Sequence, residues 1–112
     1  MVACYNYVSM KSRPIKKSTL FRKLGQFVSV RNMDSVGSYG QVENQFILNF
    51  KNGDVFQSYG ATVAAYVNGQ LYVNEYYHDY SRTTMKYCKQ YTGRSVDERR
   101  RLIQKGVIKT FI

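Results

Sequence analysis

Apolar and polar residues alternate along the middle of the chain, and turn-forming pairs interrupt the alternation. Two Asn-Gly pairs, Asn52–Gly53 and Asn68–Gly69, each lie between runs of strand character. Such a pair is the strongest short-range signal for a β-hairpin. Because Gly60 separates the two hairpins, the pattern predicts an antiparallel meander. Its strands are expected near residues 43–51, 54–59, 62–67 and 70–75.

A two-residue turn fixes the register of each hairpin. In the first hairpin it pairs Phe50 with Val55, and in the second it pairs Ala64 with Val73. The second hairpin is apolar on both faces, which is typical of central strands. The first hairpin has one face that we expect to be core, made of Phe46, Leu48, Phe50, Val55 and Tyr59.

The N-terminal part of the chain has weaker signals. Strands are expected at 2–8 and 26–31, and a short helix over 18–24 is ended by Gly25. Residues 32–40 contain the turn formers of a loop. The residues of the helix that turn inward are Leu20, Phe21 and Leu24.

After the meander the apolar period changes from two residues to that of a helix. Asp79 or Ser81 can cap a helix that runs to about Thr92, where Gly93 supplies a left-handed stop. At 100° per residue, one side of this helix is basic and the other packs on the sheet. The basic stripe is Arg82, Lys86 and Lys89, and the packed side is Thr84, Met85, Tyr87, Cys88 and Tyr91.

A second helix begins at the capping-box sequence from Ser95 to Glu98 and ends at Gly106. The tail over 107–111 is rich in β-formers and is expected to return as an edge strand. The fold class is therefore α+β, a mainly antiparallel sheet followed by two short C-terminal helices.

The 112 residues suffice for one domain with a single core. We therefore expect a single domain over 1–112. The basic segment 11–23 is either a flexible N-terminal arm or an exposed loop and helix, and the sequence leaves this choice open.

Positive charge gathers at the two ends of the chain. Residues 1–33 carry a net charge of +7, residues 34–79 carry −4 and residues 80–112 carry +7, which gives +10 in total. A field of this size attracts anions such as the phosphates of a nucleic acid or a nucleoprotein. The candidate binding cations are Lys16, Lys17, Arg22, Lys23, Arg82, Lys86, Lys89, Arg94, Arg99 and Arg100.

Tyrosine dominates the aromatic residues, with eleven Tyr, six Phe and no Trp. Tyr combines an apolar ring with a polar tip, so it is common on surfaces that meet a partner and also on half-exposed sheet faces. The candidates for partner contact are Tyr76, Tyr77 and Tyr80, which precede the basic helix.

Residues for catalysis are sparse. One histidine, His78, and two cysteines, Cys4 and Cys88, are fewer than the four ligands of a structural zinc site. Cys88 falls on the packed side of its helix, where a small apolar role is the usual one. The carboxylates are scattered among turns and do not cluster as magnesium ligands do. We therefore expect no metal, no cofactor and no enzymatic activity.

The location of the protein is suggested by what the chain lacks. Two cysteines do not form a disulfide framework, the N-terminus lacks the basic region of a signal peptide, and no apolar stretch approaches the roughly 20 residues that span a bilayer. These features predict a cytoplasmic protein that does not engage a membrane.

Three short stretches carry a resemblance. In chain order they are Gln57-Ser58-Tyr59, Val63-Ala64 and the run from Tyr80 to Lys86. They follow the order of a Ser-Tyr strand, a hairpin and a Tyr-Ser-x-Thr-Thr helix start. In this order residues 55–92 resemble a family of small bacteriophage-encoded domains of unknown function. The resemblance implies a phage setting, and hence the cytoplasm of a host cell, but implies no reaction, ligand or catalytic residue.

Two functions fit these observations. The first is a small basic protein that binds nucleic acid through Lys, Arg and exposed Tyr. The second is a phage anti-defence or host-takeover inhibitor, for example one that resembles an anti-CRISPR protein, which binds a host protein or ribonucleoprotein complex. The sequence does not choose between DNA and RNA, and it does not predict the oligomeric state.

Overall fold

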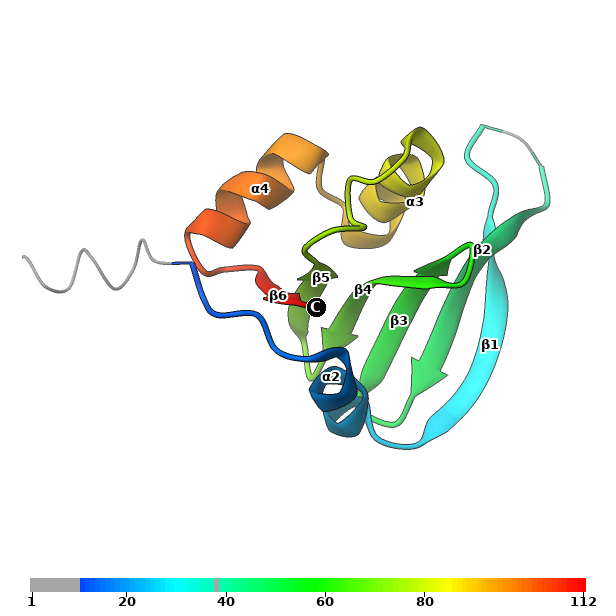
Figure 1. Ribbon diagram of the computed structural model, residues 1–112. Helices are drawn as coiled ribbons and strands as arrows, with labels where there is room; N and C mark the ends of the chain where they lie inside the picture. Colours follow the sequence, from blue (N-terminus) through cyan, green and yellow to red (C-terminus); the bar gives the residue numbers. More distant parts are fainter. Residues whose placement is uncertain (1–10, 38) are drawn as a thin grey trace, which may run out of the picture.

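The computed structural model describes residues 11–37 and 39–112, which form one sheet with helices on both of its faces (Figure 1). The sheet has six strands, and their spatial order follows the order of the chain. In chain order the elements are α2 (Lys17–Leu24), β1 (Phe27–Asp34), β2 (Gln41–Phe50), β3 (Gly53–Ser58), β4 (Ala61–Val67), β5 (Gln70–Asn74), α3 (Arg82–Thr92), α4 (Val96–Gln104) and β6 (Lys109–Phe111).

The topology confirms the predicted α+β class. Strands β1 to β5 form an antiparallel meander, and β6 joins β5 in parallel as the expected edge strand. The predicted strands of the meander each overlap an observed strand, with ends that differ by at most two residues. The helix expected over 18–24 is α2, and the strand expected at 26–31 is β1. The strand expected at 2–8 lies outside the described residues.

The register of the second hairpin is as predicted, with Ala64 opposite Val73. The register of the first is wrong by two residues, because Val55 lies opposite Leu48 and Phe50 lies opposite Gly53. The turn is therefore made by Lys51 and Asn52. Since a shift of two keeps every side chain on its face, Leu48, Phe50 and Val55 still share one face.

Tertiary hydrogen bonds explain where this first turn falls. The backbone N–H of Asn52 donates to the Leu24 carbonyl at 2.9 Å, and the Asn52 amide donates to the Lys23 carbonyl at 3.0 Å. These carbonyls lie at the end of α2 and have no partner within the helix. Asn52 is thus held in the turn by α2, and Gly53 becomes the first residue of β3.

Two apolar clusters fill the two sides of the sheet. The cluster beneath α2 contains Leu20, Leu24 and Val55, and the cluster beneath α3 contains Phe56, Val73, Tyr87 and Cys88, among others. Because both faces are covered, β4 and β5 are buried along most of their length, as the apolar sequence of the second hairpin predicted. Figure 1 shows α2 on one side of the sheet and α3 and α4 on the other.

Two smaller expectations are wrong. The loop over 32–40 is shorter, because β1 continues to Asp34 and the Asn32 amide donates to the Val42 carbonyl at 3.0 Å. Tyr59 is not a core residue, because it lies in the turn between β3 and β4 with 63% of its surface exposed.

Gly53 lies where β3 and β4 approach each other closely, and a substitution at this position tests that approach. A Cβ added at Gly53 would lie 1.8 Å from the Tyr66 carbonyl oxygen, whereas one added at Gly69 would meet no atom within 4 Å. We expect Gly53→Ala to cost about 4 kcal/mol or more in the free energy of unfolding, because backbone must move. Gly69→Ala, at φ 82°, is the control and should cost about 1 to 2 kcal/mol. Urea unfolding measures both, and equal losses would contradict the close approach.

Candidate functional site

The N-terminal segment lies beside the C-terminal strand and extends the sheet by one bridge. The Ile15 N–H donates to the Thr110 carbonyl at 3.0 Å, and the Ile112 N–H donates to the Ile15 carbonyl at 2.9 Å. The Lys17 N–H donates to the Ile112 carbonyl at 2.8 Å and leads into α2. Of the two alternatives for the basic segment, residues 15–24 therefore form an exposed loop and helix docked on the sheet. The two basic ends of the sequence meet here.

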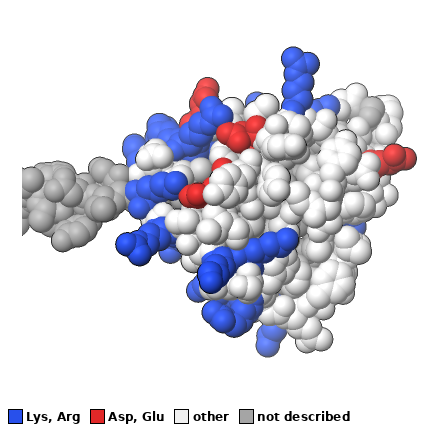
Figure 2. Space-filling model, viewed as in Figure 1, with Lys and Arg blue, Asp and Glu red and all other residues white. Residues whose placement is uncertain are grey.

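We call this surface the terminal edge; it comprises residues 11–17 and β6. In the view of Figure 2, Lys and Arg side chains gather on the side where α4, residues 11–17 and α2 lie in Figure 1. Acidic side chains are interspersed with them near α4, whereas the other side of this view is poor in cations. The cations of the terminal edge are Lys11, Arg13, Lys16, Lys17 and Lys109.

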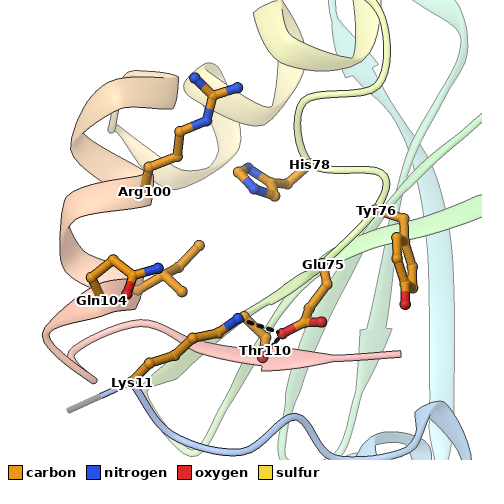
Figure 3. A pocket seen from close by; sticks show the side chains of 8 residues that line it. Lys11, Glu75, Tyr76, His78, Arg100, Gln104 and Thr110 are labelled. Carbon is orange, nitrogen blue, oxygen red and sulfur yellow. Dashed lines mark hydrogen bonds and ion pairs between the residues drawn. The ribbon is translucent and has the colours of Figure 1, made fainter.

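A first hollow, of about 310 Å³, lies between the terminal edge and α4 (Figure 3). Lys11 and Glu75 point toward each other there, with 2.9 Å between Nζ and Oε1, and Thr110 donates to the same oxygen at 3.1 Å. The hydrogen bond from Lys11 holds the pKa of the Glu75 carboxyl below its ordinary value. The lining is Lys11, Glu75, Tyr76, His78, Arg100, Ile103, Gln104 and Thr110.

A second hollow, of about 420 Å³, adjoins the first, because Tyr76 lines both. We call it the tyrosine hollow, after Tyr59, Tyr76 and Tyr77, which line it together with Lys17. Tyr59 comes from the β3–β4 turn and Lys17 from the start of α2. The fold thus brings tyrosines from two turns to a cation of the terminal edge.

The turn after β5 presents its tyrosines to solvent. The Asn74 side-chain oxygen accepts hydrogen bonds from the N–H groups of Tyr76, at 2.8 Å, and Tyr77, at 3.1 Å. The Tyr80 ring meets the Tyr77 ring edge-on, with centroids 5.6 Å apart. The Asn74 side chain therefore holds this turn, in which Tyr76, Tyr77 and Tyr80 are 67%, 41% and 74% exposed.

Arg99 is not available to a partner, although the sequence suggested it as a binding residue. It is fully buried, with exposure of 0%, and its Nη1 donates to the Arg94 carbonyl at 2.7 Å. Its Nη2 donates to the His78 carbonyl at 2.8 Å, and its Nε donates to His78 Nδ1 at 3.3 Å. The prediction failed because the position of α4 over the segment after β5 depends on tertiary packing.

Two further predicted cations are paired with acids. Arg100 lies 2.7 Å from Asp79, and Arg94 lies 3.2 Å from Glu98. Burial raises the pKa of the Asp79 carboxyl, but the hydrogen bond from Arg100 and the charges nearby outweigh it and leave that pKa lowered. Arg94 and Arg100 therefore contribute less to the positive electrostatic field around the protein than two unpaired cations would.

The predicted basic stripe on α3 is a real surface feature. Ser81 caps the helix by accepting from the Thr84 N–H at 3.1 Å, and Gly93 ends it with φ 72°. Arg82, Lys86 and Lys89 are exposed, and among the residues that the structure describes none of the three forms an ion pair. The opposite side buries Thr84, Tyr87 and Cys88 as predicted, while Met85 and Tyr91 are half-buried.

The two sets of unpaired cations do not form one surface. The α3 stripe lies on the face of the sheet opposite α2, so it is separated from Lys16, Lys17, Arg22 and Lys23. Lys86 and Lys89 instead line a hollow of about 570 Å³ beside the β1–β2 loop. Lys17, at the start of α2, belongs to the terminal edge, whereas the carbonyl of Lys23, at the end of α2, is bonded to Asn52 of the β2–β3 turn.

The groups that could carry chemistry are engaged in packing. Burial raises the pKa of the Cys88 thiol to about 11, and His78 Nδ1 accepts from Arg99. Within residues 11–37 and 39–112 no cluster of three or more His, Cys, Asp or Glu could hold a metal ion. In the same part of the chain, no helix has the length and apolar character to cross a bilayer. Cys4 lies outside the described residues.

Sequence reasoning missed four residues of the site, Tyr59, Lys11, Arg13 and Lys109. Tyr59 was assigned to the core by strand periodicity, and only the length of the β3–β4 turn could have moved it. Lys11 and Lys109 were counted in the charge of the two ends, but their proximity depends on the parallel pairing of β6 with β5. No sequence signal reveals that pairing.

The fold and the hollows define a small α+β protein with a basic edge and an aromatic surface, and comparison with known proteins adds the family. The chain belongs to the family of unknown function DUF8033, which it matches over residues 28–107. No curated protein and no solved structure matches the chain. The matched region contains Tyr59, Tyr76 and Tyr77 but ends before β6, and Lys17 precedes it.

His78 should make stability depend on pH. Burial lowers its pKa in the folded state, with the nearby Arg99 contributing, so the unfolded state binds the proton more readily. Stability is then complete above the ordinary pKa of about 6.5 and falls as pH drops below it, by at most about 1.4 kcal/mol per pH unit. We expect His78→Gln, whose amide oxygen can accept from Arg99, to remove this dependence. Urea unfolding between about pH 7.5 and about pH 5.5 tests it; equal slopes for both proteins would contradict it.

Proposed function

We propose that this protein is a small, basic, non-enzymatic binding protein that engages nucleic acid. In this proposal the cations of the terminal edge contact phosphates, and the exposed tyrosines beside them contact bases. The observation that carries the proposal is the position of Lys17, a cation without an ion pair among the described residues, in the same hollow as Tyr59, Tyr76 and Tyr77.

The distribution of ion pairs supports phosphate as the ligand of the edge. The acids near α4 are occupied by Arg94, Arg100 and Arg101, and Glu75 is occupied by Lys11. Lys16 and Lys17 are exposed and pair with none of the described acids. Surface cations that have no acidic partner attract polyanions. When they bind, they displace the counterions condensed on the polyanion, and this release favours the complex. The net charge of +10 acts in the same direction.

A bacteriophage origin and a host cytoplasmic location are part of this proposal. They rest on the resemblance of residues 55–92 described above, and the family over 28–107 adds no function. The absence of a reaction is also proposed; it is supported by the engagement of Glu75 with Lys11 and of His78 with Arg99.

One observation favours the second candidate, a phage anti-defence inhibitor that binds a host protein or ribonucleoprotein complex. Strand β1 is an edge of the sheet, and Phe27, Val28 and Val30 on it are 51%, 66% and 56% exposed. An exposed apolar edge strand is a template for pairing with another protein. This surface lies at the opposite edge of the sheet from β6, so the two candidates predict different contact residues.

Two matched triple variants separate the basic surfaces. The first variant removes three charges from the terminal edge and combines Lys16→Gln, Lys17→Gln and Lys109→Gln. The second removes three charges from the α3 stripe and combines Arg82→Gln, Lys86→Gln and Lys89→Gln. We expect the first variant to weaken binding of a short labelled single-stranded oligonucleotide about tenfold or more at low salt, because three phosphate contacts are lost. Its salt slope should fall by about 2.

The α3 variant is the control for net charge, and its loss should be clearly smaller. Fluorescence anisotropy over a salt series measures both. A larger loss in the α3 variant would move the interface to the stripe, and equal small losses would mean that charge acts only at long range. If the unmodified protein binds no oligonucleotide at low salt, the proposed function is wrong.

A further inference from the structure

Tyr59 has a backbone conformation that its side chain disfavours. The β3–β4 turn is formed by Tyr59 and Gly60, with φ 51° and 84°, and the β4–β5 turn by Asn68 and Gly69, with φ 49° and 82°. The two turns therefore have the same left-handed geometry at both positions, as type I′ turns require. Asn and Gly are the residues that tolerate the first position, whereas a bulky side chain there is a genuine outlier. Tyr59 occupies the place that Asn68 fills in the next hairpin.

Packing does not explain this choice. Tyr59 is 63% exposed, and it forms none of the ring contacts found among the described residues. Its N–H donates to the Asn44 carbonyl at 2.8 Å, a contact that any residue other than Pro can make. A strained residue without compensating core contacts indicates a use for its side chain outside folding.

The surroundings of the ring indicate which use. Tyr59 lines the tyrosine hollow with Tyr76 and Tyr77, whose turn is fixed by the Asn74 side chain. The hollow measures about 420 Å³, within the range of sites for small ligands. Flat aromatic walls suit a planar ring, and Lys17 at the same hollow suits the phosphate next to it.

We propose that the tyrosine hollow is a stacking site for one unpaired base of a single-stranded nucleic acid, with Lys17 on the adjacent phosphate. This inference rests on the proposed function and adds the substrate class, because the bases of a duplex are stacked inside it and cannot enter a hollow between tyrosines. The terminal edge then supplies affinity for both single-stranded and duplex nucleic acid, and the tyrosine hollow supplies the preference for single strands.

Tyr59→Asn tests the stacking site without damaging the fold. It removes the ring and installs the residue that already stands at the equivalent position of the β4–β5 turn, so the midpoint of thermal unfolding should stay the same or rise. Binding to a single-stranded oligonucleotide should weaken roughly 5- to 150-fold, the loss of one stacked base. The slope of affinity against salt should not change, because no charge is removed.

Three comparisons complete the experiment. Tyr39→Asn makes the same exchange at a fully exposed tyrosine outside the hollow, and it should leave binding unchanged. Tyr76→Ala should weaken single-strand binding as Tyr59→Asn does. A duplex of the same length should bind Tyr59→Asn and the unmodified protein equally, and 2-aminopurine in the single strand should lose fluorescence on binding only where the ring is present.

The outcomes separate the two proposals. No binding of either form by the unmodified protein overturns the proposed function and this inference with it. Equal binding of single strand and duplex, unaffected by Tyr59→Asn and Tyr76→Ala, leaves the basic edge as the interface and overturns the stacking site. A preference for single strands that both substitutions remove supports the inference. Loss of duplex binding as well would show that the rings contribute to a contact that both forms of nucleic acid make, and not to stacking on an unpaired base, which also overturns it.

Discussion

A buried guanidinium holds together the parts of this protein that form its candidate site. Arg99 is fully enclosed, and its charge is met by two carbonyl groups and the imidazole of His78. No carboxylate within the described residues pairs with it. A buried charge is costly unless hydrogen-bonded, so these contacts favour the observed position of α4 beside the segment after β5. Because Tyr76 and Tyr77 belong to that segment, their positions in the tyrosine hollow depend on this contact.

The second constraint is that β6 and the segment around Ile15 pair at the same edge of the sheet. β6 pairs with β5 in parallel, which requires the crossover that α3 and α4 provide. The segment around Ile15 then bonds to the free edge of β6 and delivers Lys17 to the start of α2. Covering the edge blocks its pairing with other chains, and it also brings together basic segments that are far apart in sequence. One set of backbone hydrogen bonds thus serves stability and concentrates charge.

The elements that could be predicted are those specified by local chemistry. Period-two alternation, the turn at Asn68–Gly69 and the helix stop at Gly93 each act over a few residues, and all were predicted correctly. The sequence left the cap of α3 open between Asp79 and Ser81, and the structure assigns it to Ser81. The failures involve contacts distant in sequence. Asn52–Gly53 signalled a turn whose register is decided by α2. Arg99 was a candidate binding cation because of its charge, but it is buried and bonded to His78, a residue 21 positions away in the chain. Tyr59 was missed because its face depends on where the strand ends, which periodicity within the strand does not reveal.

The cations of the terminal edge and the tyrosines of the hollow come from different parts of the sequence, and this difference bears on specificity for a ligand. The rings of the tyrosine hollow lie within the family region at 28–107, whereas Lys16, Lys17 and Lys109 lie outside it. Cations on flexible side chains attract any polyanion and discriminate poorly, while a rigid aromatic wall selects for a planar group. If the hollow binds a base, discrimination belongs to the part of the chain that defines the family, and the terminal segments add affinity to it. The strain at Tyr59 is then the conformational cost of that discrimination, since a turn optimised for folding alone would carry Asn there.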